Sequence, residues 1–309
     1  MGRRKGLPID GVLLLNKPRG LSSNAALQRA RRALGAAKAG HTGTLDPMAS
    51  GLLPVAFGEA TKFCQYLLDA DKVYLAEVRL GITTDTGDAE GQVLASSDRR
   101  PAAAEIVEIC SRFKGQMDQM PPMYSALKRD GKPLYAYARA GTEVERQARR
   151  ITIHRLEILE IRGEHFRFRV CCSKGTYIRT LAEDIGAALG CGGHLTALTR
   201  EVTGNFQITD AISLADFEAM SQDARFRCLM PADTFAKHLP ILSLSPDQGE
   251  RLSHGQGAEI TGGTILGPCR LYLGNQFLGM GRVDSAGFLT PLRLLATGND
   301  HGLELAARL

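Results

Sequence analysis

The first forty residues combine an apolar run with a segment of helical periodicity. Residues 11–15 form a short apolar run, which predicts a buried strand. Apolar residues then recur at three- and four-residue spacing between 27 and 34, and this spacing indicates a helix. We expect Ser22 or Ser23 to cap the start of this helix and Gly35 to end it.

The same two periods continue along the chain. They predict helices near 59–68, 101–114 and 178–189, and strands from 72 onward, over 151–161 and over 165–172. Tyr74 falls on the apolar face of the strand that starts at 72. Strands interspersed with helices, without regular βαβ units, predict an α+β fold with a mixed β-sheet.

Three later segments depart from this pattern. Residues 121–150 have no sustained period and mix Gly, Pro, Tyr and basic residues, so we expect an excursion from the core. Prolines at 231, 240 and 246 bracket a predicted linker. Residues 260–295 contain short alternating runs broken by turns, which is typical of a small β-barrel. The expected division is a larger domain over 1–235 and a smaller one over 240–309.

Composition narrows the class of protein. The chain has 309 residues, 44% of them hydrophobic and 23% charged, so it is long enough for two domains and too apolar to be disordered. It has no apolar run long enough for a membrane span or signal peptide. The seven cysteines are scattered without a C-x-x-C pair, so we expect no disulfide framework, no metal site and a reducing cytoplasm.

The positive charge is concentrated in two segments. The net charge is +5, yet residues 1–40 alone carry +8 and residues 128–150 carry +4, which leaves the remainder acidic. Such a distribution suits a face that binds a polyanion such as RNA. Solvated basic surfaces without a ligand are the alternative interpretation.

Generic catalytic motifs are absent from the sequence, but one loop is distinctive. Residues 41–51 read HTGTLDPMASG, and the flanking glycines and Pro47 present Asp46 on a tight loop. On general grounds Asp46 could instead cap a turn, and His41 could be a structural histidine.

Several motifs together resemble one family. They are GVLLLNKPRG (11–20), GHTGTLDP (40–47), GEATK (58–62), KVY (72–74), GITTDTG (81–87), MYSALK (123–128), CSKGTYIR (172–179) and LTR (198–200). In this order they resemble the bacterial TruB family, the tRNA pseudouridine-55 synthases. The resemblance is dense over about residues 9–205 and weaker in the C-terminal segment.

The resemblance implies a fold and a reaction. The fold would be a pseudouridine-synthase-type mixed sheet with a thumb insertion at about 121–150, followed by a small C-terminal PUA-like RNA-binding β-barrel. The reaction would flip uridine 55 out of the tRNA T loop, cleave its C1′–N1 bond and rejoin the base through C5, without an external cofactor. Asp46 would be the catalytic aspartate, either by attack on C1′ or by proton removal from C2′.

The resemblance also implies roles for other residues. Arg179 would pair with Asp46, whereas its sequence spacing alone favours a helical pair with Glu183. Tyr74 would stack on the flipped base. The remaining predicted site residues are Tyr177 and Leu198 in the nucleoside pocket, His41 in the gap left by the flipped nucleotide, and Lys17, Lys62 and Arg200 at phosphate or sugar groups.

Two other functions compete with this one. A non-catalytic tRNA-binding or remodelling protein would need only the basic segments and the barrel. A structural component of an RNA–protein particle would carry extra partner-binding segments, and we find none in the sequence. We expect a cytoplasmic monomer that binds the T arm of tRNA, with no membrane association and no obligatory protein partner.

Overall fold

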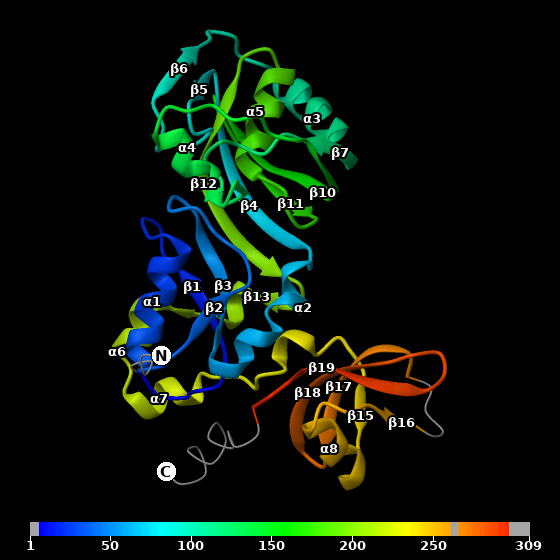
Figure 1. Cartoon of the computed structure of the whole chain (residues 1–309). Coiled ribbons are helices and arrows are strands. Elements are labelled where there is room, and N and C mark those ends of the chain that lie inside the picture. Colours follow the sequence, from blue (N-terminus) through cyan, green and yellow to red (C-terminus); the bar gives the residue numbers. More distant parts are fainter. Residues whose placement is uncertain (1–5, 261–264, 297–309) are drawn as a thin grey trace.

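A large mixed sheet forms the framework of the protein. The computed structural model describes residues 6–260 and 265–296 (Figure 1). Among them, eight strands follow one another in a continuous sheet, and two short strands pair beside it. In spatial order they are β14 (Ile212–Ser213), β1 (Gly11–Lys17), β3 (Ser50–Phe57), β12 (Gly193–Thr203), β4 (Lys72–Leu80), β11 (His165–Cys172), β10 (Arg149–Arg162) and β7 (Gly115–Gln119), with β2 (Ala39–His41) on β3 and β13 (Phe206–Gln207) on β12.

The pairing directions make the sheet mixed. Strand β1 pairs in parallel with β14, and β3 in parallel with β12, whereas the other ladders are antiparallel. Strand β12 pairs with β4 along its length and with β3 at Thr199 and Arg200. It therefore joins the half of the sheet that contains β1 and β3 to the half that contains β4, β11 and β10 (Figure 1).

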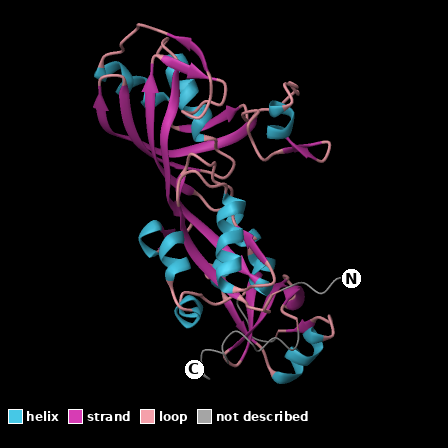
Figure 2. Ribbon diagram, turned by 90° about the vertical axis from the view of Figure 1, so that its left-hand side faces the viewer, coloured by secondary structure: helices cyan, strands magenta, loops and turns pink. Residues whose placement is uncertain are grey.

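Helices lie beside both halves of the sheet (Figure 2). They are α1 (Ser23–Leu34), α2 (Gln65–Leu68), α3 (Ala103–Arg112), α4 (Leu134–Arg139), α5 (Ile178–Ala188), α6 (Leu214–Ala219), α7 (Gln222–Arg227) and α8 (Pro246–Ser253), with 3₁₀ turns η1 (Gly58–Phe63), η2 (Ile208–Asp210) and η3 (Thr234–Ala236). Helix α1 begins after Ser22, whose side chain accepts a hydrogen bond from the amide of Ala25, and ends at Gly35 with φ +74°. Both predicted caps of this helix are thus confirmed.

Most of the predicted elements are present. The predicted strand at 72 is β4, in which alternate residues including Tyr74 are buried, and those at 151 and 165 are β10 and β11. The predicted helices at 101 and 178 are α3 and α5. The segment 59–68 is a 3₁₀ turn followed by one short helix, instead of one continuous helix. The central strands β3 and β12 were not predicted.

The thumb segment leaves the sheet between β7 and β10. It contains a short hairpin of β8 (Lys128–Arg129) and β9 (Lys132–Pro133), followed by α4. A second small hairpin, β5 (Ile82–Thr84) with β6 (Val93–Ser96), follows β4. Residues 142–148 have no helix or strand, which agrees with the absence of periodicity in this part of the sequence.

The C-terminal part forms a separate small sheet. Its strands, in spatial order, are β15 (Ile241–Ser243), β17 (Gly267–Leu273), β18 (Gln276–Val283), β19 (Phe288–Leu294) and β16 (Ala258–Glu259). Helix α8 covers an apolar core that includes Leu252 and Leu271. The predicted small β domain is therefore confirmed, although residues 261–264 and 297–309 lie outside the described residues, as do Arg3, Arg4 and Lys5 of the basic N-terminal segment.

The segment predicted as a linker packs against the rest of the protein. Phe235 is buried with Val12 and Ala56, because the chain returns to the edge of β1 before it enters the small sheet. Asp233, also buried, accepts hydrogen bonds from Arg270 Nη1 and the Tyr272 hydroxyl, both at 2.8 Å. These contacts connect the packed segment to the C-terminal sheet.

Candidate active site

The Asp46 loop is anchored to the fold through its backbone. Ser23, at the start of α1, uses its hydroxyl both to accept a hydrogen bond from the amide of Leu45 and to donate one to its carbonyl, at 2.7 and 2.9 Å. Leu45 and the following Met48 are buried in the core on β4, β11 and α5. The loop is therefore fixed on both sides of Asp46, while the carboxylate itself remains 35% exposed.

Arg200, on the central strand β12, hydrogen-bonds the backbone of the same loop. Its guanidinium donates to the carbonyls of Leu52 and Gly43, at 2.8 and 3.1 Å, and the side chain is 1% exposed. Gly43 has φ +142°, a conformation that L residues rarely adopt. Arg200 lines the site cavity while its guanidinium bonds the loop and β3, and its predicted phosphate or sugar contact stays a prediction.

Lys17 also bonds backbone carbonyls inside the fold, and its predicted phosphate or sugar contact stays a prediction. The side chain is fully buried, and Nζ donates to the carbonyls of Pro18 and Leu21 at 2.8 and 2.7 Å. Burial lowers the pKa of Lys17 to about 8, while the negative charge of Asp46 acts in the opposite direction. The ammonium thus stabilises the turn after β1 and contributes positive potential near Asp46.

Arg179 lies one residue into helix α5 and reaches Asp46. Its Nε is 2.9 Å from Oδ2 of Asp46 and 3.7 Å from Oδ2 of Asp88. Its Nη1 and Nη2 donate to the carbonyls of Thr86 and Tyr124, at 2.8 and 2.6 Å. Arg179 is 4% exposed, and its guanidinium bonds these groups. It therefore does not form the surface pair with Glu183 that helical spacing favours.

The electrostatics of Asp46 reflect opposing effects. Burial raises its pKa above the ordinary value for aspartate, and the nearby charge of Asp88 raises it further. The positive charge of Arg179 and its hydrogen bond favour the ionised form and limit this rise, with a smaller contribution from Lys17. The result is a partly desolvated carboxylate whose ionised form is favoured by its arginine partner.

Asp88 is a neighbour of the Asp46–Arg179 pair that the sequence did not reveal. It is 4% exposed, and its carboxylate accepts hydrogen bonds from the Thr86 hydroxyl and the Glu90 amide at 2.6 and 3.1 Å. Asp88 directly follows the GITTDTG motif, and this position next to a family motif is the sequence signal that could have identified it. Its approach to Arg179 depends on tertiary structure that spacing alone does not encode.

Five predicted site residues line one cavity with Asp46. The cavity has a volume of about 300 Å³ and lies between the Asp46 loop, β4, β12, the thumb and the start of α5. The predicted residues in its wall are Asp46, Tyr74, Tyr177, Arg179, Leu198 and Arg200. Burial raises the pKa of both Tyr74 and Tyr177, so both phenols are neutral at neutral pH.

Lys72 is a further lining residue that sequence reasoning did not single out. It is 7% exposed, and Nζ donates to the carbonyls of Leu68 and Ala70 at 2.7 and 2.5 Å. Burial lowers its pKa to about 8. Lys72 thereby stabilises the turn before β4 that carries Leu68, an exposed apolar residue in the cavity wall.

Three predicted residues lie outside the cavity wall, namely Lys17, His41 and Lys62. His41 ends β2 next to the wall residue Thr42, and burial together with Arg200 lowers the pKa of its imidazole, which favours the neutral form. Lys62 instead contacts the carboxylate of Glu59 at 2.5 Å and the carbonyl of Leu294 at 2.9 Å. Lys62 therefore joins η1 to the C-terminal sheet, and its predicted phosphate or sugar contact stays a prediction.

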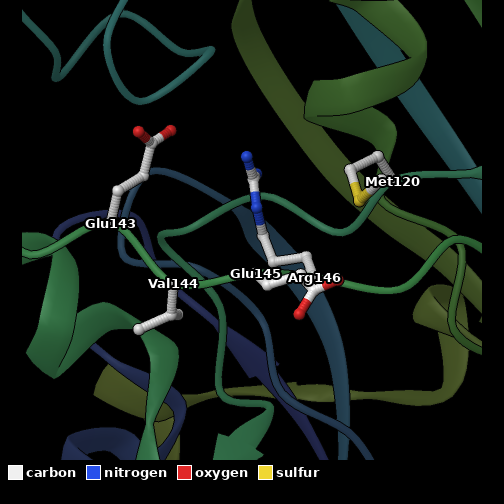
Figure 3. Close-up of a pocket in the computed structure, with 5 residues that line it drawn as sticks. All are labelled: Met120, Glu143, Val144, Glu145 and Arg146. Carbon is white, nitrogen blue, oxygen red and sulfur yellow. The ribbon is translucent and has the colours of Figure 1, made fainter.

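A second cavity lies along the thumb, near 143–146 (Figure 3). It has a volume of about 370 Å³ and is lined by Met120, Glu143, Val144, Glu145 and Arg146. Glu143 and Arg146 point to the same side of the segment (Figure 3). No lining residue of this cavity belongs to the Asp46–Arg179 cluster.

Within residues 6–260 and 265–296, no group of three or more His, Cys, Asp or Glu residues is arranged to hold a metal ion. None of the described helices is long and apolar enough to cross a membrane.

Comparison with known proteins shows the family of the chain. Residues 31–178 match the N-terminal domain of the TruB family pseudouridylate synthases, 179–237 the tRNA pseudouridylate synthase B C-terminal domain, and 240–295 the C-terminal domain of pseudouridine synthase II TruB. A tRNA pseudouridine synthase B from Azoarcus sp. (strain BH72) is 57% identical, over 94% of this chain and 96% of that protein. The chain belongs to the TruB family.

One further relative and two solved structures are also similar to this TruB chain. The tRNA pseudouridine synthase B of Chromohalobacter salexigens is 53% identical, over 96% of this TruB chain and 98% of that protein. Among solved structures, a Cbf5-Nop10-Gar1 complex contains a chain that is 28% identical, with a TM-score of 0.67 over 90% of this chain and 79% of that one. A chain of an H/ACA RNP bound to a substrate RNA containing 2′-deoxyuridine is 24% identical, with a TM-score of 0.69 over 96% and 90% of the two chains, and supports the fold.

Proposed function

We propose that this TruB-family enzyme, a tRNA pseudouridine synthase, isomerises the uridine at position 55 in the T loop of tRNA, with Asp46 as the reacting carboxylate. The observation that carries the proposal is the pair formed by Asp46 and Arg179 at 2.9 Å in the wall of the 300 Å³ cavity. A flipped base and its sugar need such an enclosed site, because the bond to be broken is inaccessible in a stacked nucleotide.

The chemistry assigned to Asp46 depends on its ionised form. Attack on C1′ and proton removal from C2′ both need an ionised carboxylate, and neither adds an atom to the product. Arg179 keeps the carboxylate ionised and directs one oxygen, since Nε contacts Oδ2. The other nitrogens of Arg179 bond two backbone carbonyls, which fixes the guanidinium before substrate arrives.

The aromatic and apolar residues suit the base. Tyr74 is 9% exposed and Leu198 is 7% exposed, and both line the cavity beside Asp46. We assign Tyr74 as the residue that stacks on the flipped uracil and Tyr177 and Leu198 as further walls. His41 is assigned to the space outside the wall, where the nucleotide leaves the T loop.

The rest of the protein would bind the T arm. The thumb carries the basic cluster at 128–150 and contributes Ser125, Ala126 and Leu127 to the cavity wall, so it can contact backbone and base together. We propose that residues 1–235 hold the reaction and that 240–309 bind RNA. We also propose that the enzyme acts as a monomer in the cytoplasm, where the seven cysteines, all within the described residues and all free, remain thiols.

A protein that only binds or remodels tRNA is the competing function. Binding a polyanion is weakened by a carboxylate in the ligand cavity, because the like charges repel. The site nevertheless contains Asp46, with a nearly fully buried arginine committed to it. This arrangement favours catalysis over binding alone.

Two unmodified tRNA transcripts test the proposed function. The purified protein is incubated with each transcript, and nucleosides are analysed after complete digestion. One transcript has uridine at position 55 and the other has cytidine there, with all other uridines kept. We expect one pseudouridine in the first transcript and none in the second. Pseudouridine in both would overturn the position, and its absence from both would overturn the activity.

A further inference from the structure

Gln119 makes an unusual contact at the junction of thumb and cavity. It ends β7, close to the start of the thumb, and is 3% exposed. Its side-chain oxygen accepts a hydrogen bond from the Tyr177 amide at 2.8 Å, and its side-chain NH₂ donates to the Tyr177 carbonyl at 3.1 Å. A backbone amide only donates and a carbonyl only accepts, so these partners fix the orientation of the Gln119 amide.

The residue held in this way controls the start of α5. Tyr177 is the N-cap of the helix, and its carbonyl also accepts the first helical hydrogen bond, from the amide of Leu181 at 3.0 Å. The Tyr177 side chain makes no capping hydrogen bond. The position of the Tyr177 backbone therefore depends on the contacts made by its own amide and carbonyl. Arg179 follows two residues later, which places its guanidinium at Asp46.

The same glutamine also marks the base of the thumb. Gln119 pairs with Arg149 in the β7–β10 ladder, so the two ends of the thumb meet at this position. Within the thumb, the carbonyl of Tyr124 accepts the 2.6 Å hydrogen bond from Arg179 Nη2. The thumb and the start of α5 are thus joined at two points, one through Gln119 and one through Arg179.

We infer that Gln119 is a positioning residue that couples the base of the thumb to Tyr177 and Arg179, and so aligns the Asp46–Arg179 pair for reaction. Gln119 does not line the cavity, so its effect is exerted through Tyr177. The expected effect of Gln119 on kcat rests on the proposed function, whereas its expected effect on the start of α5 does not.

Gln119→Met removes both hydrogen bonds with little change in volume. We expect kcat for pseudouridine formation to fall about 10- to 100-fold, because small displacements of reacting groups have effects of this size. We expect KM to change less than about threefold, since the phosphate contacts that dominate affinity lie elsewhere. Gln116→Met is the matched control, because Gln116 is an exposed residue on the same strand, and it should keep wild-type kcat and KM.

Gln119→Glu separates positioning from general loss of stability. A protonated carboxyl can accept from the Tyr177 amide and donate to its carbonyl as the glutamine does, whereas an ionised one cannot donate. Burial raises the pKa of such a carboxyl. The kcat of this variant, divided by that of wild type at each pH, should therefore rise as pH falls from about 8 to 6, while the same ratio for Gln119→Met stays flat.

Hydrogen exchange tests the structural part without any reaction. In the full-length Gln119→Met protein, the Tyr177 amide should exchange about tenfold faster than in wild type, because its acceptor is lost. Wild-type kcat in Gln119→Met, a KM rise with unchanged kcat, a flat pH ratio for Gln119→Glu, or unchanged exchange at Tyr177 would each overturn the inference. If wild-type protein forms no pseudouridine, the proposed function fails instead, and exchange at Tyr177 still decides the structural coupling.

Discussion

Arg179 Nε lies 2.9 Å from the Oδ2 atom of Asp46, and the remaining guanidinium nitrogens donate to the carbonyls of Thr86 and Tyr124. One side chain thus connects the Asp46 loop, the β5–β6 hairpin and the thumb. A planar fork with separate donors can make these contacts together, whereas a single ammonium cannot.

Arg179→Lys should therefore lower kcat strongly although it keeps the charge. We expect a loss of at least about 100-fold, the scale seen when a group that orients or stabilises reacting charge is displaced. Steady-state kinetics on an unmodified tRNA transcript measures the loss. A variant with nearly wild-type kcat would show that charge alone suffices and that the fork geometry is unnecessary.

The rate should depend on the ionisation of Asp46. Burial raises the pKa of this carboxyl, and the reaction needs the ionised form, so kcat should fall with decreasing pH at a higher pH than for an ordinary aspartate. Asp88→Asn removes a like charge that raises this pKa, and the acid limb of its kcat profile should move to lower pH. An acid limb that stays in place or moves upward would contradict this electrostatic account.

The salt dependence of tRNA affinity should distinguish two neighbouring arginines at the base of the thumb. Arg149 is exposed, whereas Nε of Arg150 is 2.9 Å from Oδ1 of Asp118 and is already partly neutralised. Arg149→Gln should reduce the slope of log affinity against log salt by about 0.7 to 0.9, the contribution of one phosphate contact. Arg150→Gln should reduce it less. Equal slopes for wild type and Arg149→Gln, measured by filter binding, would exclude a phosphate contact at that residue.

The buried ion pair that connects the two sheets should contribute strongly to the free energy of unfolding. Asp233 is 2% exposed, and Arg270 is its charged partner at 2.8 Å. Arg270→Met leaves this carboxylate buried without a counter-charge, which typically costs about 3–5 kcal/mol in the free energy of unfolding. Arg112→Met breaks an exposed pair with Glu108 and should cost about 1 kcal/mol or less. Urea unfolding of both variants provides the comparison, and similar costs would contradict the importance of the buried pair.

The sequence predicted elements whose hydrophobic pattern is local. Helix α1, with Ser22 and Gly35 at its ends, and strand β4, with alternate buried residues, follow from side-chain periodicity alone. Strand β3 contains Pro54 and follows a glycine-rich loop, so its residues lack the usual signals of a central strand. Strand β12 lies at the centre of the sheet, and its position depends on pairing with β3 and β4, which are distant in the sequence.

The site was predictable to the extent that the family motifs fixed it. The pairing of Arg179 with Asp46 came from the resemblance, since helical spacing alone favours Glu183. Lys17 and Lys62 could not be placed from the sequence, because a lysine can bury its ammonium when backbone carbonyls accept its hydrogen bonds. Asp88 is brought to Arg179 only by the packing of its loop on α5 and β12.

The central claim is that Asp46 performs the chemistry, and tritium release from C5-labelled uridine in tRNA tests it most directly. Asp46→Asn nearly preserves size and shape but removes the charge and the ability to act as nucleophile or base. We expect no detectable release by this variant, with tRNA binding within a few-fold of wild type in a parallel filter-binding titration. Substantial release by a folded Asp46→Asn protein would contradict the account, because a residue that only caps a turn could be replaced by asparagine with activity retained.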